Sequence, residues 1–255
     1  MTKVKETAKV LSQETLATGI YSLWIETKEV AKLAKPGQFI SVYSKDGARL
    51  LPRPISICEI GEDKLRIVYR VVGAGTKEFA TYKAGDSIEI LGPLGNGFPL
   101  DDDKKAFLIG GGIGIPPMLE LTKQLKGEKI VVLGYRDHQL FLKDEFEKAG
   151  ATVVVATEDG SVGTKGTVLD AIAANGLEAP VLYSCGPTPM LRALKDYALK
   201  NDMQAWISME ERMACGIGAC LACVCKSKEV DGHTNVHNKR ICKEGPVFDA
   251  REVEI

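Results

Sequence analysis

The first hundred residues alternate between apolar and polar positions over short stretches. Residues 65–71, LRIVYRV, are an example of this period of two, which is typical of strands that bury one face. Turn-forming pairs separate such stretches: Pro36-Gly37, Asp46-Gly47 and Gly92-Pro93. The pattern predicts an antiparallel β-barrel over residues 1–100, with at most one short helix, near residues 77–82.

The pattern changes after a charged run at residues 101–105, which we expect to join two domains. Five apolar runs then alternate with four stretches of helical periodicity. The apolar runs are 107–109, 130–133, 153–156, 181–184 and 206–208, and the helical stretches are 117–125, 140–149, 168–174 and 189–199. Strands that alternate with helices predict βαβ units, and therefore a parallel α/β sheet with helices on both faces over residues 101–209.

A third segment, residues 210–255, is rich in cysteine and glycine and follows neither period. It is too short to bury an apolar core of its own, so we expect a metal centre to stabilise it. The predicted fold is thus an N-terminal antiparallel barrel, a parallel α/β domain and a C-terminal metal-binding tail.

Composition and charge exclude several classes of partner. Of the 255 residues, 45% are hydrophobic and 26% are charged, which is typical of globular proteins. The 33 basic and 34 acidic residues give a net charge of −1 without a long run of one sign, so neither nucleic acid nor an anionic membrane is an expected partner. The N-terminus lacks the apolar stretch of a signal peptide, and no apolar run approaches the roughly 20 residues of a membrane span. We therefore expect a cytoplasmic protein.

Four of the seven cysteines fall within residues 215–225. In a chain without a secretory signal, this clustering favours metal ligation over disulfides. The order C-x4-C-x2-C followed by a distant fourth cysteine is the spacing of plant-type ferredoxins. It predicts a 2Fe-2S cluster, with ligands Cys215, Cys220, Cys223 and Cys242.

Two alternatives bear on these cysteines. A structural zinc site is less consistent with the spacing, because zinc usually binds two paired C-x2-C knuckles. Cys225 is a surplus thiol that can in principle replace Cys223, although the ferredoxin spacing favours Cys223. Gly216 and Gly218 suit a loop wrapped closely around a cluster, since glycine adopts positive φ without steric cost.

A glycine-rich turn, IGGGIGIPP at residues 109–117, lies between the first predicted strand of the α/β domain and its first helix. Glycine allows the backbone to approach a pyrophosphate at the start of a helix, but tight packing also requires glycine in proteins without a ligand. A second turn, SCGPTPM at residues 184–190, follows a predicted central strand, at the edge where α/β sheets bind ligands. After the predicted strand at 130–133, Asp137 can accept a bond from a ribose hydroxyl, whereas Arg136 can bind a 2′-phosphate.

Three segments of the predicted barrel carry groups that can bind a phosphate and the polar edge of a ring, although each is common in barrels. They are Arg53-Pro54-Ile55-Ser56, Val68-Tyr69-Arg70 and Gly75-Thr76.

Taken together, residues 1 to about 208 resemble the ferredoxin–NAD(P) reductase family. The resemblance implies that these three barrel segments contact FAD. It also implies a nicotinamide nucleotide site, formed by Gly110, Gly111, Gly112, Gly114, Gly186 and Pro187, with Cys185 as the catalytic residue near the nicotinamide ring. The resemblance favours NAD over NADP.

The tail is similar to that of the electron-transfer subunits of type B dihydroorotate dehydrogenases. The similarity rests on EERMACGIGACLAC at 210–223, CKEGPVF at 242–248 and LGNGF at 94–98. It implies a subunit of pyrimidine biosynthesis that passes electrons through the 2Fe-2S cluster and FAD to NAD+. The implied partner is an FMN-containing dihydroorotate dehydrogenase catalytic subunit, in a heterotetramer with two copies of each chain. Cys225 departs from this pattern.

The combination is chemically coherent, because nicotinamide exchanges two electrons as a hydride whereas an iron–sulfur cluster passes one at a time. A flavin does both and can stand between them. Two alternatives remain open at this point. One is an NAD(P)H:ferredoxin oxidoreductase or a subunit of a bifurcating complex, and the other is a zinc-binding interaction module on a nucleotide-sensing domain.

Overall fold

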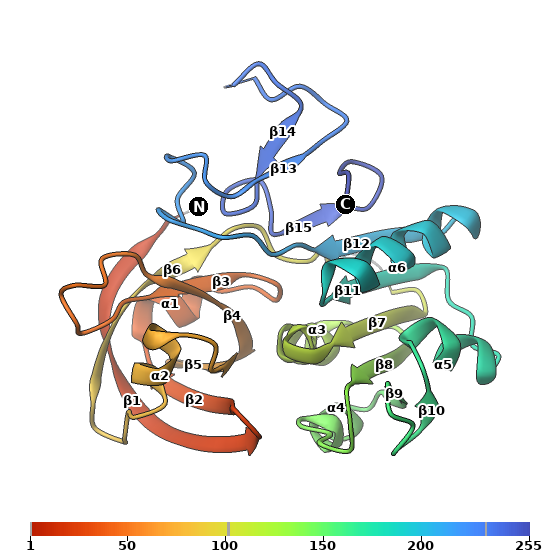
Figure 1. Ribbon diagram of the computed structural model, residues 1–255, viewed down its shortest axis with the longest axis horizontal. Helices are drawn as coiled ribbons and strands as arrows, with labels where there is room; N and C mark the ends of the chain where they lie inside the picture. The colour runs from red at the N-terminus through yellow and green to blue at the C-terminus, as the bar shows by residue number, and fades with distance from the viewer. Residues whose placement is uncertain (1, 101–102, 233) are drawn as a thin grey trace.

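The N-terminal part of the chain is a closed antiparallel barrel, as the alternating pattern predicts. The computed structural model describes residues 2–100, 103–232 and 234–255, so part of the charged run at 101–105 lies outside the described residues. The barrel has the strand order β1-β2-β5-β4-β3-β6 (Figure 1). Its strands are β1 Val4–Ala17, β2 Ile20–Glu26, β3 Phe39–Val42, β4 Arg53–Ile60, β5 Lys64–Arg70 and β6 Ser87–Leu94. Alternate side chains such as Leu23, Ile25 and Ile67 are fully buried inside it, which explains the period of two in the sequence.

Two short helices accompany the barrel. The predicted helix at 77–82 is α2, Ala74–Phe79, which begins three residues earlier because the turn before it is closed by bonds to the Thr76 hydroxyl. Helix α1, Lys28–Leu33, was not predicted. It buries only Val30 and Ala31, and so short a helix leaves no periodic pattern of apolar residues.

The middle of the chain forms the predicted α/β sheet, with the strand order β10-β9-β8-β7-β11-β12-β15, in which β15, Val247–Asp249, comes from the tail (Figure 1). The bounds are β7 Ala106–Gly111, β8 Lys129–Tyr135, β9 Thr152–Thr157, β10 Thr164–Lys165, β11 Val181–Cys185 and β12 Gln204–Ser208. Between them lie η1 Gly112–Gly114, α3 Pro116–Gln124, α4 Lys143–Lys148, α5 Val168–Ala174 and α6 Thr188–Lys200. These six strands pair in parallel. None of the described helices has the length and hydropathy to cross a bilayer.

Helices cover both faces of the sheet. Phe107 and Ile109 of β7 share a buried cluster with residues of α5 and α6, whereas Leu108 packs with residues of α3 and α4. Because both faces are covered, the strands are apolar along their whole length rather than alternating. This confirms the helices on both faces that the sequence predicts.

The tail is built onto this sheet. Its last strand, β15 Val247–Asp249, pairs antiparallel with β12. A small hairpin, β13 Val224–Lys226 and β14 Asn238–Arg240, projects from the top of the molecule (Figure 1). Ile241, Phe248 and Val253 are buried in the same cluster as the sheet residue Ile207. Apolar packing against the sheet therefore stabilises the tail in addition to any metal centre.

A buried group of charges joins the barrel to the sheet domain. Arg66 of β5 is 4% exposed, and it donates hydrogen bonds to Glu59 of β4 at 2.6 Å and to Glu145 of α4 at 2.5 Å. Glu59 also accepts a bond from Lys123 of α3. The Arg66 and Glu59 side chains are poorly hydrated, and such charges are tolerated only because each faces a partner. The arrangement holds the two domains in one relative orientation.

Replacement of Arg66 by alanine should therefore destabilise the protein strongly. It leaves Glu59 with Lys123 as its one cation and removes the bond that Glu145 makes to Arg66, and loss of one partner from a buried ion pair typically costs about 3–5 kcal/mol. Urea unfolding measures the loss, with Lys32→Ala at the exposed pair with Glu29 as a control that should change stability by no more than about 0.5 kcal/mol. A loss for Arg66→Ala no larger than that of the control would contradict this role.

Candidate functional site

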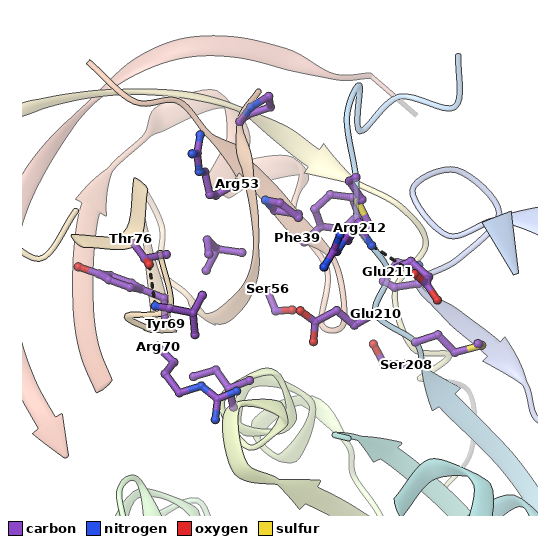
Figure 2. A pocket seen from close by; sticks show the side chains of 18 of the residues that line it. Phe39, Arg53, Ser56, Tyr69, Arg70, Thr76, Ser208, Glu210, Glu211 and Arg212 are labelled. Carbon is purple, nitrogen blue, oxygen red and sulfur yellow. Dashed lines mark hydrogen bonds between the residues drawn. The ribbon is translucent and has the colours of Figure 1, made fainter. Parts of the chain in front are cut away.

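A cleft of about 1130 Å³ opens where the barrel, the sheet and the tail meet (Figure 2). Strands β4 and β5 supply the barrel wall, and the turn before α2 closes one end. The residues predicted to contact a flavin that line this cleft are Arg53, Pro54, Ile55, Ser56, Val68, Tyr69, Arg70 and Thr76. The structure thus brings together residues that lie on three separate elements.

Gly75, the remaining predicted residue of this set, lies directly behind Arg53. A Cβ atom at Gly75 would come within 2.2 Å of Arg53 Nε, so only glycine lets the arginine side chain lie against this backbone. The Arg53 guanidinium also donates a hydrogen bond to the Leu51 carbonyl oxygen. Gly75 therefore acts by positioning Arg53 in the cleft.

Two of the predicted residues have their polar groups engaged elsewhere. The Thr76 hydroxyl accepts bonds from the Val72 and Gly73 amides at 3.0 and 3.1 Å and so shapes the turn. The Tyr69 hydroxyl donates to Gln13 Oε1 at 2.9 Å inside the barrel, and Figure 2 shows it pointing away from the other labelled cleft residues. Burial raises the pKa of Tyr69 well above its usual value. Both residues form the wall of the cleft rather than offer it a free hydroxyl.

The rest of the cleft lining comes from residues that the sequence did not identify as site residues. They are Phe39, Ile113, Thr188, Ser208, Met209, Glu210, Glu211, Arg212, Met213 and Pro246. Glu210 points toward Ser56 across the cleft (Figure 2). Ser208 ends β12, and the carboxyl end of a parallel strand is where α/β sheets gather ligands. The position at the end of a predicted strand was the signal in the sequence that could have identified Ser208 and the residues directly after it as site residues.

The two glycine-containing turns predicted to bind a nucleotide lie side by side at the carboxyl ends of the neighbouring strands β7 and β11. Gly110 at the end of β7 pairs with Cys185 at the end of β11. A Cβ at Gly114 would lie 2.4 Å from the Cys185 carbonyl oxygen, and one at Gly111 would lie 2.5 Å from Met190 Sδ. Close packing between the turns therefore explains these two glycines without a ligand.

Gly112 differs from its neighbours. Its φ is +53°, and no other described atom lies within 4 Å of a Cβ built there. Gly110 would meet Ile115 and Gly186 would meet Met190, and Pro187 precedes α6 at the N-cap. Gly112 is the member of this set whose surroundings leave room for a nucleotide.

Cys185 is partly exposed, and its thiol shares a hydrogen bond with Ser208, which lines the cleft. Burial raises the pKa of Cys185 to about 12, so the thiol is protonated at neutral pH. A protonated thiol is a poor nucleophile but can contact a neutral ring.

Asp137 is the candidate ligand for a ribose hydroxyl. Its carboxylate accepts a hydrogen bond from the Gln139 amide at 2.9 Å, within the loop that follows β8.

The four predicted cluster ligands form two pairs of thiols. Cys215 shares a hydrogen bond with Cys220, and Cys223 shares one with Cys242. Although burial opposes it, backbone donors and Cys220 lower the pKa of Cys215 to about 7. The Cys242 thiol lowers the pKa of Cys223 to about 6, while the pKa of Cys242 is raised by Cys223. Thiolates are the form that binds metal.

The loop around these thiols has the shape that the sequence predicts. Gly216 and Gly218 have φ of +67° and +88°. The Ile217 and Ala219 amides point at Cys215 Sγ, at 3.5 and 3.3 Å. Such N–H groups stabilise sulfur that carries negative charge.

The arrangement of donors favours two irons over one zinc ion. Zinc in a structural site takes four ligands around one point, whereas a 2Fe-2S cluster needs two thiolates at each of two irons. Two thiol pairs fit the second requirement.

Cys225 lies apart from both pairs. It belongs to β13, is buried, and its thiol donates to the Lys239 carbonyl at 3.5 Å. Burial raises the pKa of Cys225 to about 11, which disfavours the thiolate. These surroundings support the prediction that Cys223, rather than Cys225, is a ligand.

The cleft and the cysteine loop are neighbours along the chain and in space. Met213 lines the cleft, and Cys215 follows two residues later. A Cβ at Gly216 would touch Ser41 Oγ of the barrel at 2.9 Å, so the loop rests directly on β3. Groups bound in the two places would be separated by only a few residues of protein.

Comparison with known proteins bears on this pair of sites. Residues 210–254 match the family model described as the iron-sulfur cluster binding domain of dihydroorotate dehydrogenase B. The chain is 43% identical over 250 residues to the "Dihydroorotate dehydrogenase B (NAD(+)), electron transfer subunit" of Caldanaerobacter subterraneus subsp. tengcongensis. It is 44% identical over 260 residues to the protein of the same name from Bacillus cereus strain B4264. Each alignment covers 98% of this chain and 98% of the relative.

Solved structures agree on the fold. An NADH-dependent reduced ferredoxin-NADP oxidoreductase, described in connection with flavin-based electron bifurcation, superposes with a TM-score of 0.86 at 29% identity. That alignment covers 97% of this chain and 89% of the other. The ferredoxin reductase of carbazole 1,9a-dioxygenase superposes with a TM-score of 0.67 at 19% identity, over 80% of this chain and 67% of the other, which supports the fold alone.

Substitution of serine for each cysteine should separate ligands from the surplus thiol. We expect Cys215→Ser, Cys220→Ser, Cys223→Ser and Cys242→Ser to lose or severely destabilise the cluster. Cys225→Ser is the matched control, because it is two residues from Cys223 and equally part of the tail. Iron and sulfide content and the visible spectrum report the outcome. Loss of iron from the Cys225 variant, with retention in the Cys223 variant, would reverse the assignment.

Gly112→Ala should weaken NADH binding without loss of FAD. The added Cβ occupies the open space that a pyrophosphate needs, so we expect the NADH concentration that half-reduces the flavin to rise about tenfold or more. Gly150→Ala is the control for backbone strain, since Gly150 also has positive φ and open surroundings. Anaerobic titration with NADH measures the effect, and equal curves for the two variants would exclude this placement of the nucleotide.

Proposed function

The chain belongs to the family of dihydroorotate dehydrogenase B electron transfer subunits, and we propose that it carries electrons from a dihydroorotate-oxidising partner through a 2Fe-2S cluster and FAD to NAD+. The observation that carries this proposal is the continuity of residues 209–215. Met209 to Met213 line the large cleft, and Cys215 begins the cysteine loop. One short segment therefore belongs to both sites.

The cleft suits FAD in its shape and its chemistry. When bound, FAD exchanges two electrons with a nicotinamide and single electrons with an iron–sulfur cluster. Arg53 and Arg70 bring positive charge for the phosphates, while Phe39, Ile55 and Val68 bring apolar surface for the ring system. Pockets for cofactors commonly combine an apolar lining with a few placed polar groups.

The cysteine loop suits the cluster. Cys215, Cys220, Cys223 and Cys242 would supply the four thiolates. Two of them, Cys223 and Cys242, are 2% and 1% exposed, while Cys220 is exposed. The cluster would thus have one side within the protein, toward the cleft, and one side near the surface.

NAD would bind at the edge of the sheet, over Gly112 and beside Cys185. Ile113 and Thr188, from the two glycine-containing turns, both line the cleft, so a nicotinamide held by these turns reaches the flavin site directly. The protonated Cys185 thiol and the Ser208 hydroxyl would contact the ring edge without adding a charge. Gly110, Gly111, Gly114 and Gly186 would act by allowing the two turns to pack closely.

The partner, by family, is the catalytic subunit that oxidises dihydroorotate, and we place an FMN in it and two copies of each chain in the complex. Ile217 and Leu221 flank the exposed Cys220 and are 43% and 42% exposed. Apolar side chains grouped at a surface mark interaction sites. Docking at this surface would bring the partner close to the cluster, and an obligate contact of this kind buries about 2,000 Å² or more in total.

A second function in the same chemical class is transfer to a ferredoxin or within a bifurcating complex. The structural similarity to the NADH-dependent reduced ferredoxin-NADP oxidoreductase favours it. The higher identity over the whole chain to dihydroorotate dehydrogenase B subunits favours the first function. The choice of electron donor distinguishes the two.

Reconstitution with the catalytic subunit should be required for dihydroorotate-dependent reduction of NAD. We expect the isolated chain to oxidise NADH with an artificial acceptor but to have no activity toward dihydroorotate. Ile217→Glu should weaken the complex, because it puts a charge into an apolar contact. Leu199→Glu is the matched control, since Leu199 is also 43% exposed but lies on α6.

Dihydroorotate oxidation by the isolated chain, or failure of the catalytic subunit to confer it, would overturn the assignment. Retention of the visible cluster spectrum in Ile217→Glu separates loss of docking from loss of the cluster. Ferredoxin-dependent activity without the catalytic subunit would favour the second function.

A further inference from the structure

One buried arginine of the tail, Arg240, has no part in the functions assigned so far. It ends β14 and is 5% exposed. Its guanidinium donates to the Glu244 carboxylate through Nε at 3.0 Å and through Nη2 at 2.6 Å. A third nitrogen, Nη1, donates to the Gly218 carbonyl oxygen at 3.2 Å, within the cysteine loop. A side chain of the hairpin therefore holds a peptide group of the loop that carries Cys215 and Cys220.

The Gly218 carbonyl belongs to the same peptide unit as the Ala219 amide. In a trans peptide the C=O and N–H bonds point in opposite directions, so a donor that fixes the carbonyl also fixes the direction of the amide. The Ala219 amide points at Cys215 Sγ at 3.3 Å. Arg240 thus binds one end of a peptide dipole whose other end faces a predicted ligand of the cluster.

This peptide unit needs a restraint from outside the loop. Gly218 has a φ of +88°, a region that glycine enters without steric cost, and glycine has access to other conformations as well. Rotation of the unit would turn the Ala219 amide away from Cys215. The Gly218 amide itself donates a hydrogen bond to the Cys242 thiol, so Gly218 lies between the two thiol pairs and its orientation affects both.

Arg240 is itself held from several sides. Its amide donates to Glu244 Oε2 at 2.8 Å, and its carbonyl oxygen accepts bonds from the Lys243 and Glu244 amides at 3.0 and 2.8 Å. Asp231 Oδ1 lies 3.7 Å from Nη2. Because the planar guanidinium donates in fixed directions, these contacts determine where Nη1 meets the Gly218 carbonyl.

The positive charge of Arg240 is a second means by which it could act on the thiols. Glu244 and Asp231 lie 2.6 and 3.7 Å from the guanidinium and bring two negative charges against one positive charge. The three side chains together therefore present no net positive charge to the cysteines. The hydrogen bond to Gly218 does not depend on that balance, so the arrangement favours an effect through the peptide unit.

We propose that Arg240 is a positioning residue that raises the reduction potential of the cluster, because it directs the Ala219 amide at Cys215. The inference rests on the proposed function, in which four cysteines bind a 2Fe-2S cluster. Gain of one electron adds negative charge at the sulfur atoms, and an N–H group directed at sulfur stabilises that form more than the oxidised form. The bond from Arg240 thus favours acceptance of an electron from the donor.

The test uses the full chain with its flavin and cluster, reduced in steps and followed by electron paramagnetic resonance, which detects the unpaired electron of the reduced cluster. At a fixed potential we expect the ratio of reduced to oxidised cluster to fall about tenfold in Arg240→Ala, which is about 59 mV for a one-electron couple. Arg240→Lys should show a similar fall, because one ammonium nitrogen cannot occupy the positions of three guanidinium nitrogens.

Lys243→Ala is the matched control for charge. Lys243 directly follows Cys242, and its ammonium lies 3.9 Å from Glu244 Oε1. The substitution removes one positive charge beside the same ligands and leaves the bond between Arg240 and Gly218 in place. Since the Lys243 side chain is 54% exposed, we expect the ratio to stay within about twofold of the wild-type value. Iron content and the visible spectrum verify that each variant holds its cluster.

Unchanged or higher potentials in both Arg240 variants would overturn the proposal. A wild-type potential in Arg240→Lys alone, or an equal fall in Lys243→Ala, would also overturn it and would assign the effect to charge. Loss of iron from both Arg240 variants would overturn it as well, because the residue would then be required for the site to form. If only Arg240→Ala loses its iron, Arg240→Lys decides.

The wild-type protein separates this inference from the proposed function. Absence of a 2Fe-2S signal from the reduced wild-type chain would contradict the proposed function at the cluster. A wild-type signal together with unshifted Arg240 variants would leave the proposed function intact and overturn the role of Arg240 alone.

Discussion

The site depends on the attachment of the tail to both of the other domains. On one side, the Asn96 amide at the end of the barrel donates to the Gly245 carbonyl at 2.6 Å, and the Asn96 side chain donates to Glu244 at 2.7 Å. On the other side, β15 pairs with β12, and the Met209 amide donates to Pro246 at 2.9 Å. These bonds fix the position of the tail residues that line the cleft and of the segment that follows Cys242.

This attachment explains why a chain of three parts has a single connected site. The barrel contributes the arginines, the sheet contributes the two packed turns, and the tail contributes both the acidic wall and the thiols. The buried Arg66 group fixes the barrel against α3 and α4, so the flavin and nucleotide walls cannot separate without exposing unpaired charge. Electron transfer over a short distance requires such a fixed arrangement.

The glycines of the site illustrate how one residue type serves different purposes. Gly111 and Gly114 are required by contact with the facing turn, and Gly75 is required by the Arg53 side chain. Gly112 faces open space, and Gly216 and Gly218 adopt positive φ around the thiols. A glycine-rich motif therefore indicates that another group packs closely against the backbone, and that group can belong to the protein rather than to a ligand.

Local pattern alone was enough to predict the two main domains. Alternation in the barrel strands and continuous apolar runs in the sheet strands follow from burial on one face and on both faces, respectively. The spacing of the cysteines likewise identified the candidate ligands, because a cluster requires four thiolates in a compact loop. These features depend on residues that are close together in the chain.

The remaining features were decided by contacts between distant segments. Helix α1 is too short to leave a period, and β15 is too short to be recognised before it pairs with β12. Residues 210–213 open the tail motif, but nothing in that motif indicates that Ser208 to Met213 form a cleft wall with Arg53 and Ser56. These features depend on which distant segments come into contact in the folded chain, and the local pattern of residues does not determine those contacts.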